Sequence, residues 1–416
     1  MIDRSQYSIG VPAEDLEQYC PGGFHPTYLG DTLNGGQYEI VHKLGFGSYS
    51  TVWLAQDHKN RINVAVKIVV ARKSEEHNHE LKILRHLRET GDPDHPGHRH
   101  VSHPLDSFYH EGPNGRHLCV VMEWLGLQTS AVAELYDEYR LDGELARRVS
   151  RQALLAVDYL HSCGVAHADI HMGNILFRRS EAERSSSLDQ IIEVLGEPSK
   201  GGVARKDGSP LEKGVPEYLV EPAEAECLVD FEQLDEVQLV DFGESFYISN
   251  PPKMINTPVS FYPPELVFKR KLTEAVDIWN LGSTTYELVI GRPAFEAFLD
   301  EYSLIPQFRK VIGGVPEDWI SDAFSSGVLT EEPDESNADG FEPLEEQIQR
   351  DYCRDGESGG TPPLSEEDLQ LLGHYLRRML VVHAEQRAGA KDLLTEPWVS
   401  DCRERAVDVA EADALP

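Results

Sequence analysis

Cysteine is scarce in this chain, and its few copies are scattered. None of the six lies in a C-x-x-C pair, and no stretch of the sequence spaces them densely. This pattern argues against the disulfide framework of a small secreted domain and against a cysteine-based zinc site. We therefore expect reduced thiols in an intracellular protein, located in the cytoplasm, the nucleus or both. The cysteines are Cys20, Cys119, Cys163, Cys227, Cys353 and Cys402.

Long apolar runs are also missing. No run of about 20 apolar residues occurs, and a helix needs about that many to cross a bilayer. Residues 1–6 show no basic segment followed by an apolar one. We therefore expect no signal peptide and no contact with a membrane.

Positive charge is the third shortage. The 416 residues contain 38 Lys and Arg against 72 Asp and Glu, a net charge of −34. This balance disfavours direct binding of nucleic acid and favours basic partners. Residues 180–238 hold 15 acids against 5 bases, and residues 317–370 hold 17 against 2. Both stretches are rich in Gly, Ser, Pro and Glu, so we expect largely solvated insertions that serve either solubility or attraction of a basic substrate.

The apolar pattern changes character once along the chain. Residues 38–70 alternate between apolar and polar and break at glycines, which predicts antiparallel strands, and residues 118–122 predict one more. Helical spacing marks residues 75–88, 144–162, 274–290 and 365–381. The sequence thus predicts an α+β, bilobal architecture with a small β-rich lobe and a larger helical lobe. We expect a leader at 1–37, an N-lobe at 38–124, a hinge near 123–126, a C-lobe at 125–400 with both insertions, and a tail at 401–416.

A glycine-rich segment in the N-lobe carries a nucleotide-binding pattern. Residues 44–52 read L-G-F-G-S-Y-S-T-V, and glycines without Cβ let backbone amides approach phosphate oxygens. The next strand carries Lys67 between apolar residues, and Glu80 on the following predicted helix is better placed to pair with it than Glu75 or Glu76. The expected ATP contacts are Leu44, Gly45, Phe46, Gly47, Ser48, Tyr49, Ser50, Val52, Ala65, Lys67, Glu80, Met122, Glu123 and Leu125.

Residues 167–174, H-A-D-I-H-M-G-N, carry the pattern of a phosphoryl-transfer loop. Asp169 is the candidate base, and Asn174, five residues on, is a candidate Mg²⁺ ligand. The second candidate ligand is Asp241 in V-D-F-G, 72 residues after Asp169, which is a long separation. His171 is the third candidate in this loop.

Further segments in the right order make the chain resemble the eukaryotic protein kinases over residues 38–400. They are P-P-E at 263–265, D-I-W-N-L-G at 277–282 and E-Q-R at 385–387. The leader at 14–31, E-D-L-E-Q-Y-C-P-G-G-F-H-P-T-Y-L-G-D, is similar to that of the SR-protein kinases, with divergent fungal-type members the nearest in character. The resemblance implies ATP- and Mg²⁺-dependent phosphorylation of serines in Arg/Ser-rich proteins such as splicing factors. It also implies that Asp277 orders the catalytic loop and that Arg387 pairs with Glu265.

The chain departs from that family at several positions. His171 stands where the family has a lysine that neutralises the transferred phosphate, and this predicts a reduced rate. Ala168 stands where most protein kinases have an arginine that grips a phosphorylated activation segment, so we expect an enzyme active without that phosphate. Tyr262 replaces an arginine before Pro263-Pro264-Glu265. Asp300 and Glu301 match the start of the family's acidic docking groove, but Arg309 and Lys310 lie where a carboxylate is expected.

Two other functions stay open from the sequence. The chain could be a nucleotide-binding pseudokinase that acts as an acidic scaffold, or a small-molecule phosphotransferase. We expect ATP and basic Arg/Ser-rich proteins as partners, no direct nucleic acid, and a monomer. Zinc binding by His95, His98, His100 and His103 is conceivable, but a solvated Pro/Gly-rich loop is the better interpretation.

Overall fold

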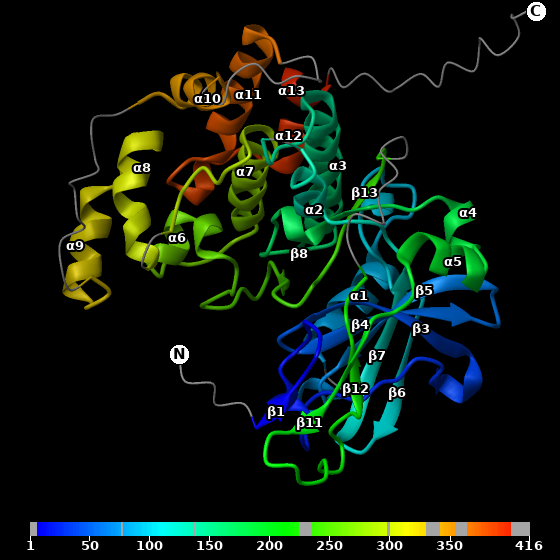
Figure 1. Ribbon diagram of the computed structural model, residues 1–416. Coiled ribbons are helices and arrows are strands. Elements are labelled where there is room, and N and C mark those ends of the chain that lie inside the picture. The colour runs from blue at the N-terminus through cyan, green and yellow to red at the C-terminus, as the bar shows by residue number, and fades with distance from the viewer. Residues whose placement is uncertain are drawn as a thin grey trace, which may run out of the picture.

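The computed structural model has two lobes, a β-sheet lobe and a helical lobe (Figure 1). The chain passes from the first lobe to the second after the strand β7, Gly115–Glu123. It describes residues 6–75, 78–136, 138–223, 234–297, 300–329, 342–353 and 364–400. The predicted α+β bilobal fold is confirmed. None of the helices within these ranges is long and apolar enough to cross a bilayer.

A six-stranded antiparallel sheet forms the N-lobe, in the order β2-β3-β4-β5-β7-β6. Its inner face packs against helix α1, His79–Thr90, through Leu81, Leu84 and Leu87. The Asn78 side chain accepts a hydrogen bond from Leu81 N and so begins the helix. The strands are β2 (Thr32–Leu33), β3 (Tyr38–Gly47), β4 (Ser50–Asp57), β5 (Ile62–Val69), β6 (Asp106–Gly112) and β7 (Gly115–Glu123).

An additional layer covers the outer face of this sheet. It consists of leader residues 6–31 and insertion residues 198–223, which we call the outer layer. Val220 is buried with Trp53 and Ile40 of the sheet, and Leu29 packs against the same cluster, so the sheet is apolar on both faces. Within the layer, β1 pairs with β11 although nearly 200 residues separate them (Figure 1). Its strands are β1 (Tyr7–Ser8), β10 (Lys200–Gly202), β11 (Ala204–Arg205) and β12 (Tyr218–Val220).

The first insertion therefore differs from the solvated C-lobe segment predicted for residues 180–238. It leaves after β9, Ile175–Phe177, and returns at β13, Val237–Leu239, as expected, and these two strands pair. Between them its described part lies on the N-lobe. Capping boxes begin the helices α4, Glu181–Arg184, and α5, Leu188–Leu195. The insertion is ordered here because apolar side chains on one face of α5, Ile191 and Leu195, are buried against the N-lobe.

Two central helices organise the C-lobe. Helix α3, Gly143–Ser162, begins where Asp142 accepts from two backbone amides, and its apolar face follows the predicted spacing. Helix α7, Ala275–Ile290, is buried on nearly all sides and forms the core of the lobe. The shorter elements are α2 (Thr129–Ala133), β8 (Val165–Ala166), β14 (Phe246–Tyr247), α6 (Pro264–Val267), α8 (Ile305–Ile312), α11 (Glu366–Met379), α12 (Ala390–Leu393) and α13 (Pro397–Ser400).

The second acidic stretch is also more ordered than predicted. Helices α9, Glu317–Ser325, and α10, Leu344–Cys353, both pack on the C-lobe core. Trp319 and Ile348 supply the contacts, because each is buried among apolar side chains. Residues 330–341 and 354–363 of this stretch lie outside the described part of the chain.

Candidate active site

The register of the N-lobe strands brings the predicted nucleotide residues together. Val52 lies opposite Gly45 on one side and Lys67 on the other, while Ala65 lies opposite Met122. Val52, Ala65 and Met122 thus form an apolar surface beside Lys67. Of the other predicted contacts, Leu44 to Gly47 end β3, Ser48 and Tyr49 form the turn, Ser50 begins β4, Glu123 ends β7 and Leu125 follows it.

Lys67 pairs with two carboxylates that come from different parts of the fold. Its Nζ donates to Glu80 at 2.7 and 2.9 Å and to Asp241 Oδ1 at 3.4 Å. Burial opposes the charge on Lys67, but both carboxylates outweigh it and raise the pKa of Lys67. The lysine in turn lowers the pKa of Asp241. The Lys67 ammonium ion therefore links Glu80 of the N-lobe to the ionised Asp241. The predicted pairing of Lys67 with Glu80 is found.

Asp277 on α7 holds the backbone of the catalytic loop. Its two oxygens accept hydrogen bonds from the N–H groups of His167, at 2.9 Å, and Ala168, at 2.7 Å. Ala168 has φ of 69°, a left-handed conformation that is costly for any residue with a Cβ. The buried carboxylate stabilises this conformation, as the resemblance implied.

The two carboxylate oxygens of Asp169 have different environments. Oδ2 accepts a hydrogen bond from Asn174 Nδ2 at 3.1 Å, and the same amide donates to the Asp169 carbonyl at 2.9 Å. Oδ1 is buried and has no hydrogen-bond partner among the described residues. One oxygen thus orients the carboxylate, and the other is available to accept a proton.

One ring nitrogen of His171 accepts a hydrogen bond from the backbone. Its Nδ1 accepts from Gly173 N at 3.0 Å and so begins the short 3₁₀ helix Met172–Asn174. In the neutral ring the proton therefore resides on Nε2, which lies 3.7 Å from Asp169 Oδ1. The imidazole faces the candidate base as a single hydrogen-bond donor.

Asn174 and Asp241 fit a metal site in which the protein supplies only some of the ligands. Within the described residues there is no group of three or more His, Cys, Asp or Glu side chains that could hold a metal ion. Mg²⁺ commonly takes one or two protein oxygens and fills its remaining positions with water and substrate phosphates. The amide oxygen of Asn174 and the carboxylate of Asp241 suit that arrangement.

The activation segment, residues 241–265, is anchored at both ends. Near its start, Glu244 accepts from Asn256 N at 2.8 Å and Asn256 Nδ2 at 3.0 Å. At its end, Glu265 forms a bidentate pair with Arg387 at 2.6 and 2.7 Å, and both side chains are buried. These contacts fix the segment near both of its ends.

This arrangement of residues agrees with the comparisons with known proteins. The protein kinase domain profile matches residues 38–186 and 225–399. The chain belongs to the protein kinase family. The unmatched stretch between these two parts contains most of the insertion that covers the N-lobe.

Its relatives include kinases of the SR-protein type. Protein kinase dsk1 of Schizosaccharomyces pombe is 39% identical over 39% of this chain and 30% of its own length. SRSF protein kinase 3 of Homo sapiens is 38% identical over 39% of this chain and 29% of its own length. These alignments therefore span less than a third of each relative. The serine/threonine-protein kinase SRPK of Physarum polycephalum is 27% identical over 93% of this chain and 91% of its own length.

The fold is also found among solved structures. A crystal structure of a kinase domain superposes with a TM-score of 0.63 and 19% identity, covering 90% of this chain and 98% of that one. At this identity the likeness concerns the fold alone.

The side chains that brace the kinase hinge were not predicted from the sequence. Arg178 donates to both carboxylate oxygens of Glu123, at 3.1 and 3.2 Å, and the Arg179 guanidinium lies 4.2 Å from the Trp124 ring centroid. The insertion helix α5 adds Ile191 to this cluster. Only the position of two arginines directly after the strand at 175–177 hinted at such a role.

A second group that the sequence reasoning missed lies on α7 near the base. Thr284 donates to the Ile170 carbonyl at 3.2 Å, and Glu287 lies one turn further on the same face. Burial raises the pKa of Glu287, and the charge of His171 partly offsets it. No described side chain donates a hydrogen bond to the Glu287 carboxylate.

The two carboxylates at the start of the expected docking groove have different environments. Asp300 accepts from Tyr302 N and Ser303 N and so caps a 3₁₀ helix, which occupies its carboxylate. Glu301 and Glu244 both raise the pKa of Tyr262, after the larger effect of burial. Glu301 therefore adds negative charge beside the segment that precedes Glu265.

The histidine-rich loop is less solvated than predicted. His100 is buried and its Nδ1 bonds the Val237 carbonyl at 2.9 Å. His98 and His103 stack on each other with centroids 4.2 Å apart, and both rings contact Tyr159. These imidazoles pack the loop against α3 because apolar partners and carbonyl groups are within reach.

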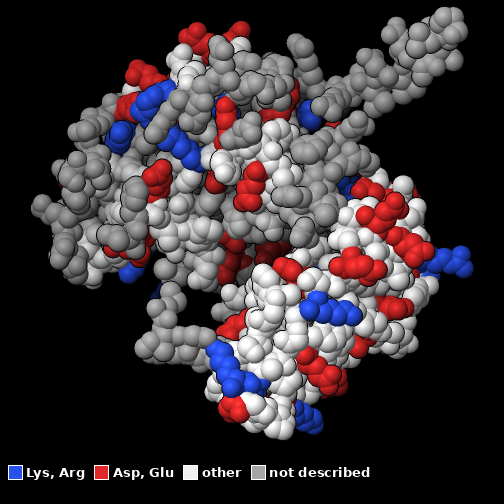
Figure 2. Space-filling view, in the orientation of Figure 1, with Lys and Arg blue, Asp and Glu red and all other residues white. Residues whose placement is uncertain are grey.

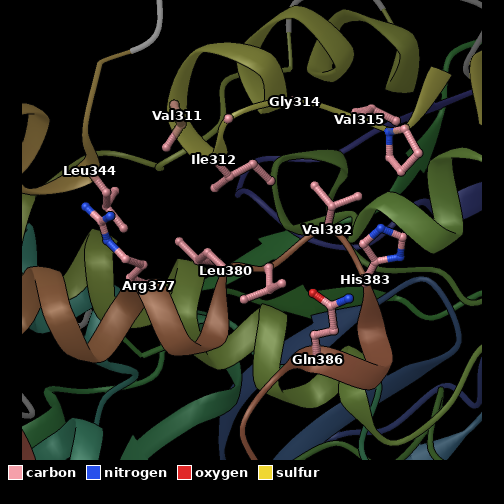
Figure 3. Close-up of a pocket in the computed structure, with 13 residues that line it drawn as sticks. Val311, Ile312, Gly314, Val315, Leu344, Arg377, Leu380, Val382, His383 and Gln386 are labelled. Atoms are coloured by element: carbon pink, nitrogen blue, oxygen red, sulfur yellow. The ribbon is translucent and has the colours of Figure 1, made fainter.

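A separate cavity of about 560 Å³ lies in the C-lobe (Figure 3). Val311, Leu380 and Val382 line it together with His383, and none of the predicted site residues does. Its Arg377 is paired with Glu345. The cavity is therefore not part of the candidate active site.

Proposed function

We propose that this chain is an ATP- and Mg²⁺-dependent protein kinase that phosphorylates serines in Arg/Ser-rich proteins. The observation that carries the proposal is Lys67, bridged to Glu80 and Asp241 while Asp169 keeps one oxygen unpaired. Protein kinases need these contacts for transfer, because catalysis of this reaction consists mainly of positioning and charge stabilisation.

The chemistry follows from these positions. Asp169 Oδ1 accepts the proton of the substrate serine hydroxyl, and the serine oxygen forms a bond to the γ-phosphorus of ATP. The bond from that phosphorus to the β,γ-bridging oxygen breaks, and ADP leaves with the electron pair. Lys67 stabilises the remaining phosphates, and Asn174 keeps Asp169 oriented. Mg²⁺ held by Asn174 and Asp241 would neutralise charge on the phosphate oxygens.

Three carboxylates support a preference for arginine-containing substrates. Glu287 lies near His171 of the catalytic loop, and Glu244 and Glu301 lie near Tyr262 towards the end of the activation segment. Asp and Glu side chains also gather in the hollow between the lobes on the face shown in Figure 2. A guanidinium ion matches a half-buried carboxylate better than a neutral side chain does, because the pair restores the lost solvation of the carboxylate.

We further propose that the kinase is active without phosphorylation of its activation segment. The Glu244–Asn256 contact and the buried Glu265–Arg387 pair supply the order that a phosphate supplies elsewhere. Ala168 is consistent with this proposal, because it offers no guanidinium to a phosphate.

The test is transfer of labelled phosphate from MgATP to an Arg-Ser repeat peptide. Asp169→Ala is the control for catalysis, and a peptide with glutamine in place of each arginine is the control for specificity. We expect incorporation into the Arg-Ser peptide alone, with Glu287→Gln raising KM for that peptide. Binding of MgATP without transfer to any peptide would replace this proposal with the pseudokinase scaffold. Transfer to small hydroxyl compounds alone would favour the small-molecule phosphotransferase.

A further inference from the structure

The tip of the glycine-rich loop has few packing contacts of its own. A methyl group added to Gly45 or Gly47 would meet no heavy atom within 4 Å. Phe46 and Tyr49, on either side of Gly47, are exposed, yet both rings lie near cations that belong to the rest of the N-lobe. The aromatic rings are therefore the points at which this loop can be held.

The first cation is Lys43, which is fully buried. Its Nζ lies 5.2 Å from the Phe46 ring centroid and 5.6 Å from that of Trp53. The carboxylate of leader residue Glu14 binds this ammonium ion through Oε2 and accepts from Tyr19 OH through Oε1. Burial lowers the pKa of Lys43, and Glu14 counters that effect. Without Glu14 the lysine would lose the partner that keeps it charged.

The second cation is Arg72, 5.9 Å from the Tyr49 ring centroid. Its Nη2 donates to leader residue Gln18 at 2.9 Å, and its backbone N donates to the Gly22 carbonyl at 2.8 Å. Lys73 lies 5.1 Å from the same ring. The leader thus contacts the cation beside Phe46 and one of the two cations beside Tyr49.

We propose that the leader is a positioning element of the nucleotide site. Glu14 and Gln18 act through Lys43 and Arg72 to hold the Phe46 and Tyr49 rings, and so keep the glycine-rich loop over the triphosphate. This inference rests on the proposed kinase function, in which that loop covers the phosphates of ATP. Glu14 and Gln18 are positioning residues, because neither touches the nucleotide.

The experiment measures binding of MgATP and of adenosine by calorimetry, without phosphoryl transfer. We expect Glu14→Gln and Phe46→Leu each to weaken MgATP binding several-fold, up to about tenfold, because the contact joins a buried ammonium ion to an exposed ring. Adenosine binding should not change, because the loop tip acts on the phosphates. The double variant should be no weaker than the stronger single variant.

Asp368→Asn is the matched control. It removes the charge that pairs with the buried Arg147 in the C-lobe, and it should lower the melting temperature without changing MgATP affinity. Should Glu14→Gln not fold, Gln18→Ala and Tyr49→Leu test the second contact in the same way, with Gln18 only half-buried and Tyr49 exposed.

Three results would overturn the inference: unchanged MgATP affinity, an equal loss for adenosine and MgATP, or additive effects in the double variant. A wild type that binds MgATP but phosphorylates no peptide would reject the proposed function alone.

Discussion

His171 Nε2 lies 3.7 Å from Asp169 Oδ1, while the other ring nitrogen of His171 accepts the Gly173 amide. In the neutral imidazole, Nδ1 is thus occupied by a backbone hydrogen bond, and Nε2 carries the one N–H that can be donated. Asp169 Oδ1, the unpaired oxygen, is the group it faces. The loop therefore keeps the geometry of the catalytic base but lacks a fixed positive charge beside it.

Replacing His171 with lysine should increase kcat. A permanent ammonium ion would stabilise the charge that develops on the transferred phosphate, and single donors of this kind are worth about 3–4 kcal/mol. We expect a gain of roughly tenfold or more in kcat with little change in KM for ATP, measured with the Arg-Ser peptide. His171→Gln, which is neutral, is the control. A His171→Lys rate at or below the wild type would show that charge at this position does not limit the reaction.

Breaking the Glu265–Arg387 pair should strongly destabilise the protein. Both side chains are almost fully buried, and loss of one partner leaves an uncompensated charge, which costs about 3–5 kcal/mol. Glu265→Gln should therefore lower the free energy of unfolding in urea by that amount. The exposed pair Arg270–Asp322 is the control, since Asp322→Asn should cost less than about 1 kcal/mol. Equal losses in both variants would contradict the distinction.

The folded protein should lose stability as the pH falls below about 6.5. Burial lowers the pKa of His25 to about 3 and those of His100 and His103 to about 4. In the unfolded chain these residues bind protons near pH 6.5, so between pH 6.5 and about 4 the unfolded state holds more protons. Above pH 6.5 these histidines are neutral in both states, so they no longer favour the unfolded state and the free energy of unfolding is highest there.

Urea unfolding at pH 7.5, 6 and 5 measures this effect. Each histidine should contribute about 1.4 kcal/mol per pH unit below pH 6.5. His100→Gln should reduce the slope by one proton. A constant free energy of unfolding across this range would show that these imidazoles take up protons in the fold.

Phosphatase treatment should leave the kinase rate unchanged within about twofold. The activation segment is held by Glu244 and by Glu265, and Ala168 offers no cation to a phosphate. Rates before and after treatment, with mass spectrometry to establish the loss of phosphate, provide the measurement. A large fall in kcat after treatment would mean that a phosphate orders the segment after all.

The sequence by itself determined the kinase fold and indicated candidate reacting groups. Glycines, Lys67, Asp169, Asn174 and Asp241 are recognisable because their chemistry needs those residue types in that order. The predicted helices also agree closely with α1, α3, α7 and α11, since amphipathic spacing is a local property of the chain. The pairing of Glu80 with Lys67 followed from the same reasoning.

Only the tertiary structure decided what covers the N-lobe and what each side chain of the site contacts. Composition made the first insertion look like a solvated acidic stretch, yet a few apolar residues, among them Ile191 and Val220, fix it to the sheet. The pairing of Glu14 with Lys43, and the orientation of His171 between Gly173 and Asp169, depend on contacts made by the folded backbone. Such contacts leave no periodic signal in the sequence, because they join segments whose separation along the chain is arbitrary.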